Sequence, residues 1–288
     1  MKGSVRQMSW TAPKLTDPLV ERAREGDAQA LEALLAAVAP AIHRFGARMC
    51  RSGADADDVL QDTLIAVATN LKGFEGRSAL SSWLFALARS ACARRRRGLK
   101  NRPHLGTETL ESERDETPSP EQRVLDRELG EAIARALEAL PEDYREAVLL
   151  RDVEGLSAAE AAEAIGVSVE ALKSRLHRGR AALHRQLALT TERGGTRGRM
   201  APGADSPATG CPDIVRLWSR KHEGELSKLD CAEIEQHVAG CPSCDAICEE
   251  LKKALEACRL SATDRVDPGT RERVKRALRS WSSQPKRH

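Results

Sequence analysis

Residues 157–180 read SAAEAAEAIGVSVEALKSRLHRGR and carry the clearest structural motif of the sequence. Ser157 is a good helix-capping residue and predicts a short helix over residues 158–165. Gly166-Val167-Ser168 predicts a tight turn, and a second, basic helix follows over residues 169–183. A short helix, a glycine turn and a basic helix form the helix-turn-helix plan, in which the second helix enters the DNA major groove.

The second helix carries the residues expected to read DNA. The packing positions of the motif are Ala161, Ile165, Val167, Leu172 and Leu176. Lys173, Ser174 and Arg178 are then left facing outward. Arg and Lys donate hydrogen bonds to guanine edges, and Ser contacts either phosphate or base. The pattern favours a duplex DNA interface, and the alternative is an ordinary helical hairpin with a solvated basic face.

The composition of the whole chain agrees with a helical fold. Of 288 residues, 41% are hydrophobic and 31% charged, but only 3% are aromatic. Ala, Leu, Glu and Arg dominate, and these favour helices over strands, so we expect an all-α protein. The best apolar stretch, Ala30 to Ile42, contains Glu32 and Pro40 and is too short to span a bilayer. Residues 1–18 lack the apolar core of a signal peptide, so we expect a cytoplasmic protein with no membrane contact.

Composition shifts divide the chain. The expected parts are a helical block at 19–98, an acidic linker at 99–122, a second helical block at 123–189, a flexible linker at 190–210, a Cys-rich module at 211–260 and a basic tail at 261–288. In the first block we expect helices from 28 to about 38, from 41 to 50 and from 55 onward. A further helix is expected to be capped by Ser81 or Ser82.

A run of four arginines ends the first block: Arg94, Arg95, Arg96 and Arg97. Consecutive helical arginines point in different directions and make a dense positive site. They indicate either a solvated helix C-terminus or phosphate contacts. Phe74, Trp83 and Phe85 lie just upstream, and aromatic residues beside arginines can serve single-stranded nucleic acid. For Trp83, core packing is the preferred interpretation.

Cysteines concentrate at the other end of the chain. The module contains Cys211, Cys231, His237, Cys241, Cys244, Cys248 and Cys258. Cys241-Pro-Ser-Cys244 is a CxxC pair, and His237 precedes it by one helical turn. Cys211 completes a set of three thiolates and one imidazole that suits tetrahedral zinc, with Cys231 as its rival.

Among the other cysteines, Cys248 and Cys258 have two interpretations, whereas Cys50 and Cys92 have one. Cys244, Cys248 and Cys258 fall on one helix face with two leucines. Cys248 and Cys258 are therefore either small buried hydrophobic residues or part of a second soft-metal site or thiol switch. Cys50 and Cys92 lie in apolar helices far upstream, and we expect both in the core.

Several of these stretches resemble a known family in the right order. Residues 19–97 resemble region 2 of extracytoplasmic-function (ECF) sigma factors of bacterial RNA polymerase, and residues 137–187 resemble region 4. DADDVLQDT at 55–63 is similar to the polymerase-binding helix, and FEGRS at 74–78 resembles the segment that opens and reads the promoter −10 element. The resemblance implies polymerase contacts from Asp55, Asp57, Asp58, Gln61 and Asp62.

The same resemblance assigns DNA contacts. It implies −10 contacts near Phe74 and Arg77, and −35 contacts from the helix that holds Lys173, Ser174, Arg175, Arg178 and Arg180. It also implies that the acidic linker threads through the active-site channel of core RNA polymerase. The polymerase does the chemistry in this family. No nucleophile–base or paired-carboxylate constellation stands out here, so we expect no catalytic residues, no enzyme activity and no small-molecule substrate.

The Cys-rich block resembles the zinc-binding anti-sigma domain, and its fusion to a sigma factor resembles the metal-responsive CorE-like group. The block has no Cys-x-Cys pair of the copper-responsive members, which leaves Zn²⁺ or Cd²⁺ ahead of Cu as the sensed metal. The resulting hypothesis is an ECF sigma factor that binds core RNA polymerase and promoter DNA under metal control. Two alternatives stay open: a thiol redox switch on the same sigma factor, and a stand-alone helix-turn-helix regulator.

Overall fold

The computed structural model describes residues 16–50, 53–99, 132–193 and 211–260, together with Gly269, Glu272 and Arg276. Every regular element in these ranges is helical, which confirms the all-α expectation. The acidic linker, the flexible linker beyond residue 193 and the rest of the basic tail lie outside the described residues, as does the side chain of Cys258.

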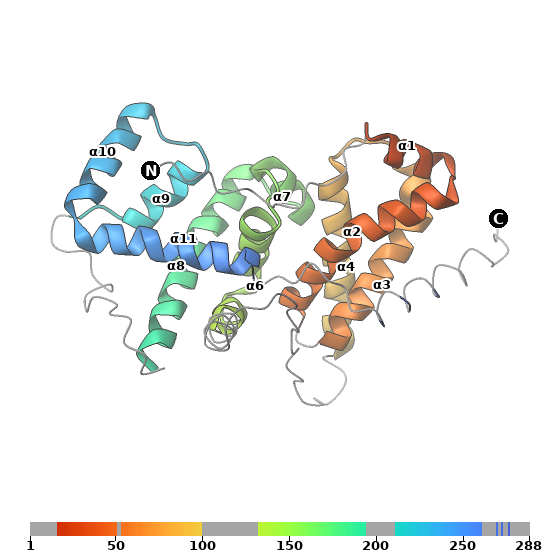
Figure 1. The fold of residues 1–288 in the computed structure, drawn as a ribbon, viewed down its shortest axis with the longest axis horizontal. Coiled ribbons are helices and arrows are strands. Elements are labelled where there is room, and N and C mark those ends of the chain that lie inside the picture. The colour runs from red at the N-terminus through yellow and green to blue at the C-terminus, as the bar shows by residue number, and fades with distance from the viewer. Residues whose placement is uncertain are drawn as a thin grey trace, which may run out of the picture. The chain divides into compact units, whose positions relative to one another are not determined.

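The described helices belong to two compact units. The first contains α1 (Pro18–Glu25), α2 (Ala28–Met49), α3 (Gly53–Asn70), a 3-10 turn (Leu71–Gly73), α4 (Leu80–Leu99) and α7 (Ala158–Ile165). The second contains α6 (Glu142–Val148), a π-helical turn (Leu149–Val153), α8 (Val169–Arg193), α9 (Ile214–His222), α10 (Lys228–Gly240) and α11 (Pro242–Leu260) (Figure 1).

In the first unit, two sequence predictions about helix ends are wrong. Asp27 caps α2 as expected, but the helix continues through Pro40 to Met49 instead of stopping near Val38. Ser81 and Ser82 do not cap α4, because the helix already begins at Leu80. Their buried hydroxyl groups instead donate hydrogen bonds to α7, at distances of 2.6 and 3.1 Å from the Glu160 side chain and backbone oxygen.

Helix α2 also corrects the argument about the membrane. As a continuous helix of 22 residues it is long and apolar enough to cross a bilayer, so the expectation that it is too short does not hold. Leu34, Val38, Ile42 and Phe45 are at most 1% exposed. Packing within the protein therefore accounts for the apolar face of α2.

The helix-turn-helix elements form as the sequence predicts. Ser157 and Glu160 make a reciprocal capping box at the start of α7. Gly166 ends α7 with a φ of +73°, the left-handed conformation that glycine adopts without strain. Ser168 then accepts a hydrogen bond from the Ala171 N–H at 3.1 Å and opens α8, which extends ten residues beyond the predicted end.

Helix α8 approaches α6 closely at Gly179. A Cβ at this position would lie 2.8 Å from a methyl group of Val148 and 3.1 Å from the backbone oxygen of Tyr144. Only glycine therefore fits at this crossing without a shift of the neighbouring atoms.

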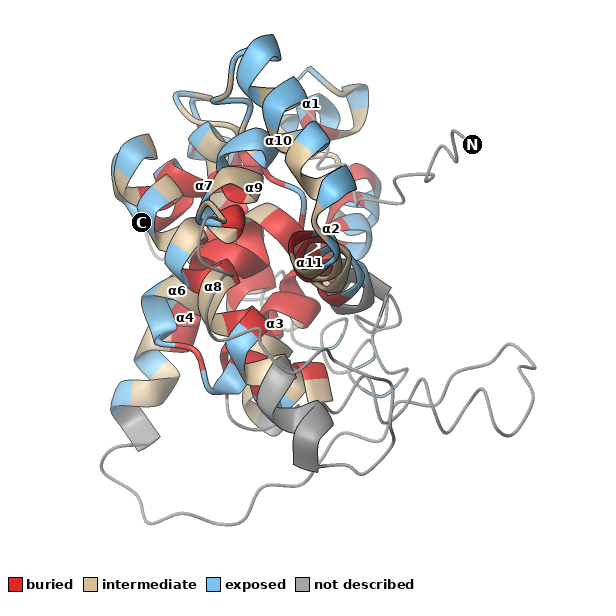
Figure 2. Ribbon diagram, turned by 90° about the vertical axis from the view of Figure 1, so that its left-hand side faces the viewer, coloured by how far each residue is buried: buried red, intermediate tan, exposed pale blue. Residues whose placement is uncertain are grey.

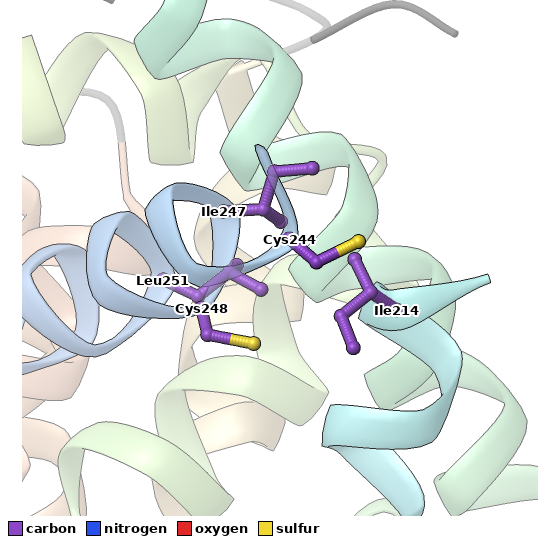
Figure 3. Close-up of a cluster of buried hydrophobic side chains, with 5 residues drawn as sticks. All are labelled: Ile214, Cys244, Ile247, Cys248 and Leu251. Carbon is purple, nitrogen blue, oxygen red and sulfur yellow. The ribbon is translucent and has the colours of Figure 1, made fainter. Parts of the chain in front are cut away.

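The C-terminal helices share a small core. Ile214, Cys244, Ile247, Cys248 and Leu251 form a buried cluster (Figure 3). Helix α10 has no buried residue and is the most exposed of these helices, as its pale colour in Figure 2 indicates. The module thus depends on few apolar contacts.

Candidate nucleic-acid and metal sites

Helix α8 has an apolar side and a basic side. Leu172 and Leu176 are fully buried, as the sequence predicts, whereas Ser174 and Arg178 are exposed. The Arg178 guanidinium lies 3.4 Å from the Tyr144 hydroxyl, a long hydrogen bond. Ser174 and Arg178 are therefore placed where a DNA duplex could reach them.

The other predicted DNA-binding residues of α8 are engaged within the second unit. The Lys173 ammonium lies 2.7 Å from a carboxylate oxygen of Glu225, and this hydrogen bond raises the pKa of Lys173. Arg175 pairs with Asp143 at 3.2 Å. In this arrangement each of the two charges already has a carboxylate partner.

Arg180 is the most buried of the basic residues, with no exposed side-chain area. Its guanidinium donates two hydrogen bonds to Asp152, at 3.0 and 2.7 Å, and one to Glu223 at 2.7 Å. It also donates to the Ser219 hydroxyl at 2.6 Å and lies over the Trp218 ring, 5.6 Å from its centroid. A DNA contact by Arg180 stays a prediction that requires these bonds to open.

This cluster joins the C-terminal module to α8 and the π-helical turn. The side chain of Glu223 is 2% exposed and also accepts a hydrogen bond from Arg151 at 3.0 Å. The ring of His222 stacks on Trp218, with centroids 5.2 Å apart, and desolvation lowers the pKa of His222. Asp152, His222 and Glu223 have the residue types of a metal site, but the guanidinium of Arg180 already neutralises their carboxylates. Loss of one partner from this buried network would leave the other charged groups without a full set of hydrogen bonds and would destabilise the folded protein.

In the first unit, predicted DNA-binding arginines pair with predicted polymerase-binding acids. Arg95 on α4 lies 2.6 Å from Asp58 on α3, and Arg94 lies 3.9 Å from Asp62. Arg94 and Arg97 are exposed. Such exposed pairs are weak and exchange readily for other partners.

The first unit also holds the remaining residues predicted to bind the −10 element or polymerase. His43 contacts Asp57 at 3.3 Å, and Arg77 pairs with Glu75 at 3.1 Å. Asp55, Gln61 and Arg96 are half-buried.

The aromatic residues upstream of the arginines divide into two pairs. Phe45 and Phe85 pack edge to face in the core, 5.5 Å apart. Phe74 and Trp83 stack with centroids 4.8 Å apart, with Phe74 buried and Trp83 half-buried. Phe74 is therefore a covered member of a stack.

Four predicted metal ligands come together in the C-terminal module. The ligand atoms of Cys211, His237, Cys241 and Cys244 lie within 4.8 Å of one another. The sulfurs of Cys211 and Cys241 are 3.7 Å apart, and His237 Nε2 is 3.3 Å from the Cys244 sulfur. Zinc–sulfur bonds of about 2.3 Å in a tetrahedron place sulfurs roughly 3.8 Å apart, so the donor set fits zinc.

The other cysteines of the module lie outside this set. Cys231 on α10 is absent from the cluster, which favours Cys211 as the fourth ligand. Cys248 is 5% exposed in the apolar core, and burial raises its pKa (Figure 3). Burial likewise raises the pKa of Cys244 to about 12, and only a bound cation would hold such a thiol deprotonated at neutral pH.

Comparisons with known proteins match three segments of the chain. Residues 34–102 match Sigma-70 region 2, and residues 130–183 match Sigma-70 region 4. Residues 211–244 match a family described as a zinc finger.

Individual relatives agree with these family matches. The chain is 34% identical over 162 residues to the ECF RNA polymerase sigma factor SigM of Mycobacterium tuberculosis H37Rv, covering 79% of that protein and 56% of this chain. It is 32% identical over 179 residues to the ECF RNA polymerase sigma-E factor of Escherichia coli K12, covering 93% of that protein and 59% of this chain. The chain is an ECF sigma factor.

This ECF sigma factor also matches a solved structure, that of the sigma factor RpoE in complex with the anti-sigma factor NepR from Bartonella quintana. The identity is 26%, the TM-score 0.45, and the match covers 55% of this chain and 96% of the other. The stand-alone helix-turn-helix alternative is wrong, because the sigma factor carries both region 2 and region 4. Sigma factors are transcription initiation factors, and this one adds a Cys-rich module after region 4.

The sequence did not identify the acidic partners of α8. Glu223 and Glu225 stand in a short loop between two helices of the Cys-rich block, and nothing in their spacing assigns them to a distant arginine or lysine. Only the folded chain brings them to Arg180 and Lys173.

Proposed function

We propose that this ECF sigma factor binds core RNA polymerase in the cytoplasm, recognises the −35 and −10 elements of its promoters, and is regulated by metal binding to its C-terminal module. One observation carries the regulatory part: Glu223 and Glu225 of the module hold Arg180 and Lys173 of α8, the helix that reads the −35 element in the proposal. A carboxylate on these cations competes with DNA for the same charges.

Promoter recognition is assigned to two surfaces. Ser174 and Arg178 are exposed on α8 and would contact base edges or phosphates at −35, with Lys173 joining them when Glu225 withdraws. The arginines at the end of α4 would hold phosphates near the −10 element, whose unpaired bases would lie by Phe74 and Arg77. Unpairing and extruding a base costs a few kcal/mol, which binding must offset.

Polymerase binding is assigned to α3. The acidic residues Asp55, Asp57, Asp58 and Asp62, together with Gln61, would face polymerase from this helix. Asp58 and Asp62 form only half-exposed pairs with α4 arginines, and these pairs can exchange for basic groups of a partner at little cost.

Cys211, His237, Cys241 and Cys244 would hold the metal, and Zn²⁺ suits their donor set best. When bound, zinc supplies a cross-link between the segment before α9, the end of α10 and the start of α11. In small domains such a site contributes on the order of 10–16 kcal/mol to folding. A metal regulates α8 only if it binds the docked and undocked arrangements with different affinity. Cd²⁺ and Cu remain candidates for the sensed metal.

The test is in vitro transcription with core RNA polymerase and the full-length chain on its own upstream region. Reactions are run without metal and then with Zn²⁺, Cd²⁺ and Cu titrated separately. We expect specific initiation that one metal raises or lowers. Cys241→Ser should abolish that response, whereas Cys231→Ser, outside the cluster, should keep it.

Two outcomes would redirect the proposal. Initiation that is indifferent to every metal but follows the thiol oxidant diamide would favour the redox alternative, in which oxidation of Cys211 and Cys241, 3.7 Å apart, removes the metal. Failure to initiate with core polymerase under any condition would refute the sigma-factor activity itself.

A further inference from the structure

Two cysteines of the first unit have no part in the proposed function. Cys50 caps the C-terminus of α2, directly after Met49, and Cys92 lies in the middle of α4; both are buried, at 6% and 0% exposure. Their sulfur atoms are 3.3 Å apart. We propose that Cys50 and Cys92 form a peroxide-sensitive dithiol in region 2, which closes to a disulfide that ties α2 to α4.

The geometry requires only a small movement. A disulfide bond is about 2.05 Å long, so the sulfurs must approach by about 1.3 Å. Cys50 sits past the last residue of α2 with an extended backbone, φ −94° and ψ 162°, held by its N–H bond to the Gly46 oxygen at 2.8 Å. A residue at a helix end can shift without breaking the helix, whereas Cys92 is fixed within α4.

The surroundings assign different roles to the two thiols. The hydrogen bond from Cys92 lowers the pKa of Cys50, and Arg96 and Arg95 add to this effect against burial and Asp55. Thiolates are the reactive form of cysteine, so Cys50 is the thiol that meets the oxidant. It is also the less deeply buried of the two. Cys92 is then the resolving thiol.

The reaction needs one equivalent of a small hydroperoxide, and hydrogen peroxide is the simplest. The Cys50 thiolate attacks one peroxide oxygen, the O–O bond breaks, and the departing hydroxide takes a proton to become water. The sulfur of Cys92 then attacks the Cys50 sulfenic acid, the S–O bond breaks, and a second water leaves with the Cys92 proton. Two thiols are oxidised to one disulfide and one peroxide is reduced to two waters.

The position of the bond gives it a consequence separate from the metal site. Helix α3 begins at Gly53, three residues after Cys50, and carries the acids assigned to polymerase binding. Arg95, three residues after Cys92, pairs with Asp58 of that helix at 2.6 Å. A covalent tie between α2 and α4 would therefore restrain the chain where it enters α3. Disulfides of reducing compartments are typically transient and redox-sensing, and this one fits that class.

The experiment maps disulfides in the full-length, zinc-loaded chain. The protein is treated with one equivalent of hydrogen peroxide, alkylated, and digested with trypsin without reduction. Cleavage beside the flanking arginines gives Met49–Arg51 and Ser90–Arg94 as the peptides that hold the two cysteines. We expect these peptides to appear cross-linked, two hydrogens lighter than their sum, and to separate again after reduction.

Two variants make the assignment specific. Cys92→Ala should eliminate the cross-linked peptide and leave Cys50 oxidised without a partner. Cys231→Ala, a cysteine on α10 outside both thiol clusters, should leave the cross-link unchanged. Recovery of Cys50 and Cys92 as alkylated, unoxidised thiols while peroxide is consumed by the C-terminal cysteines would overturn the proposal. The wild-type map decides the question even if a variant folds poorly.

Discussion

Replacing Glu223 with glutamine removes one negative charge from a buried position where two arginines meet. The carboxylate of Glu223 is 2% exposed and accepts hydrogen bonds from Arg180 at 2.7 Å and from Arg151 at 3.0 Å. Glutamine keeps the shape but brings an NH₂ group against a guanidinium. Hydrogen bonds to charged groups contribute about 1.5–3 kcal/mol each, and breaking a buried pair costs about 3–5 kcal/mol.

Arg180 keeps both of its bonds to Asp152 in the variant, so the lower end of this range applies. A loss of about 3 kcal/mol shifts the docking equilibrium of the module roughly a hundredfold toward the open state. Duplex affinity rises with the competent fraction. We therefore expect Glu223→Gln to tighten binding to a duplex from the chain's own upstream region by up to about a hundredfold.

The assay is fluorescence anisotropy with that duplex, together with amide hydrogen exchange of α9 in the free protein. Glu235→Gln is the matched control, because Glu235 pairs with Lys221 at an exposed position and should leave both readings unchanged. Faster exchange in α9 with tighter duplex binding is the expected pair of results. Unchanged exchange and unchanged affinity in Glu223→Gln would refute the claim that this cluster holds the module on α8.

Three further predictions concern stability. Gly179→Ala should lower the melting temperature measured by calorimetry, because its Cβ would lie 2.8 Å from Val148 and overpacking costs about 1–3 kcal/mol. The control Gly73→Ala, with open space around it, should leave the melting temperature nearly unchanged. Burial lowers the pKa of His222, so the unfolded state binds more protons. The free energy of unfolding should then be largest above about pH 6.5 and fall below it. His222→Gln should make the melting temperature less dependent on pH between about 7.5 and 5.5. A metal chelator should unfold α10, and circular dichroism should register the lost helix; unchanged helicity after complete metal removal would contradict a structural metal.

The sequence was sufficient where short-range signals act alone. Ser157, Gly166 and the spacing of Leu172 and Leu176 predicted the helix-turn-helix, because capping, left-handed turns and periodic burial depend on neighbouring residues. The ligand set around His237 was predictable for the same reason, since a CxxC pair and one helical turn fix most of its geometry.

Long-range packing defeated the same reasoning elsewhere. The sequence predicted one helix that stops near residue 38 and another that begins at 41, but buried side chains on both sides of Pro40 keep α2 continuous. Ser82 was expected to cap a helix, yet its hydroxyl donates a hydrogen bond to the backbone oxygen of Glu160, 78 positions away. The family resemblance implied a DNA contact for Arg180, and only the folded chain brings Asp152 and Glu223 to it.

The pairing of Lys173 with Glu225 constrains how this protein can diverge. In the proposed function, the side chain at position 173 contributes both to promoter preference and to the contact that holds the C-terminal module on α8. A substitution at position 173 that directs the factor to new promoters would therefore also change how firmly the module holds α8, unless position 225 changes with it. We expect positions 173 and 225 to vary together in descendants of this chain. A change in the promoters recognised would then come with a change in how firmly the module holds α8.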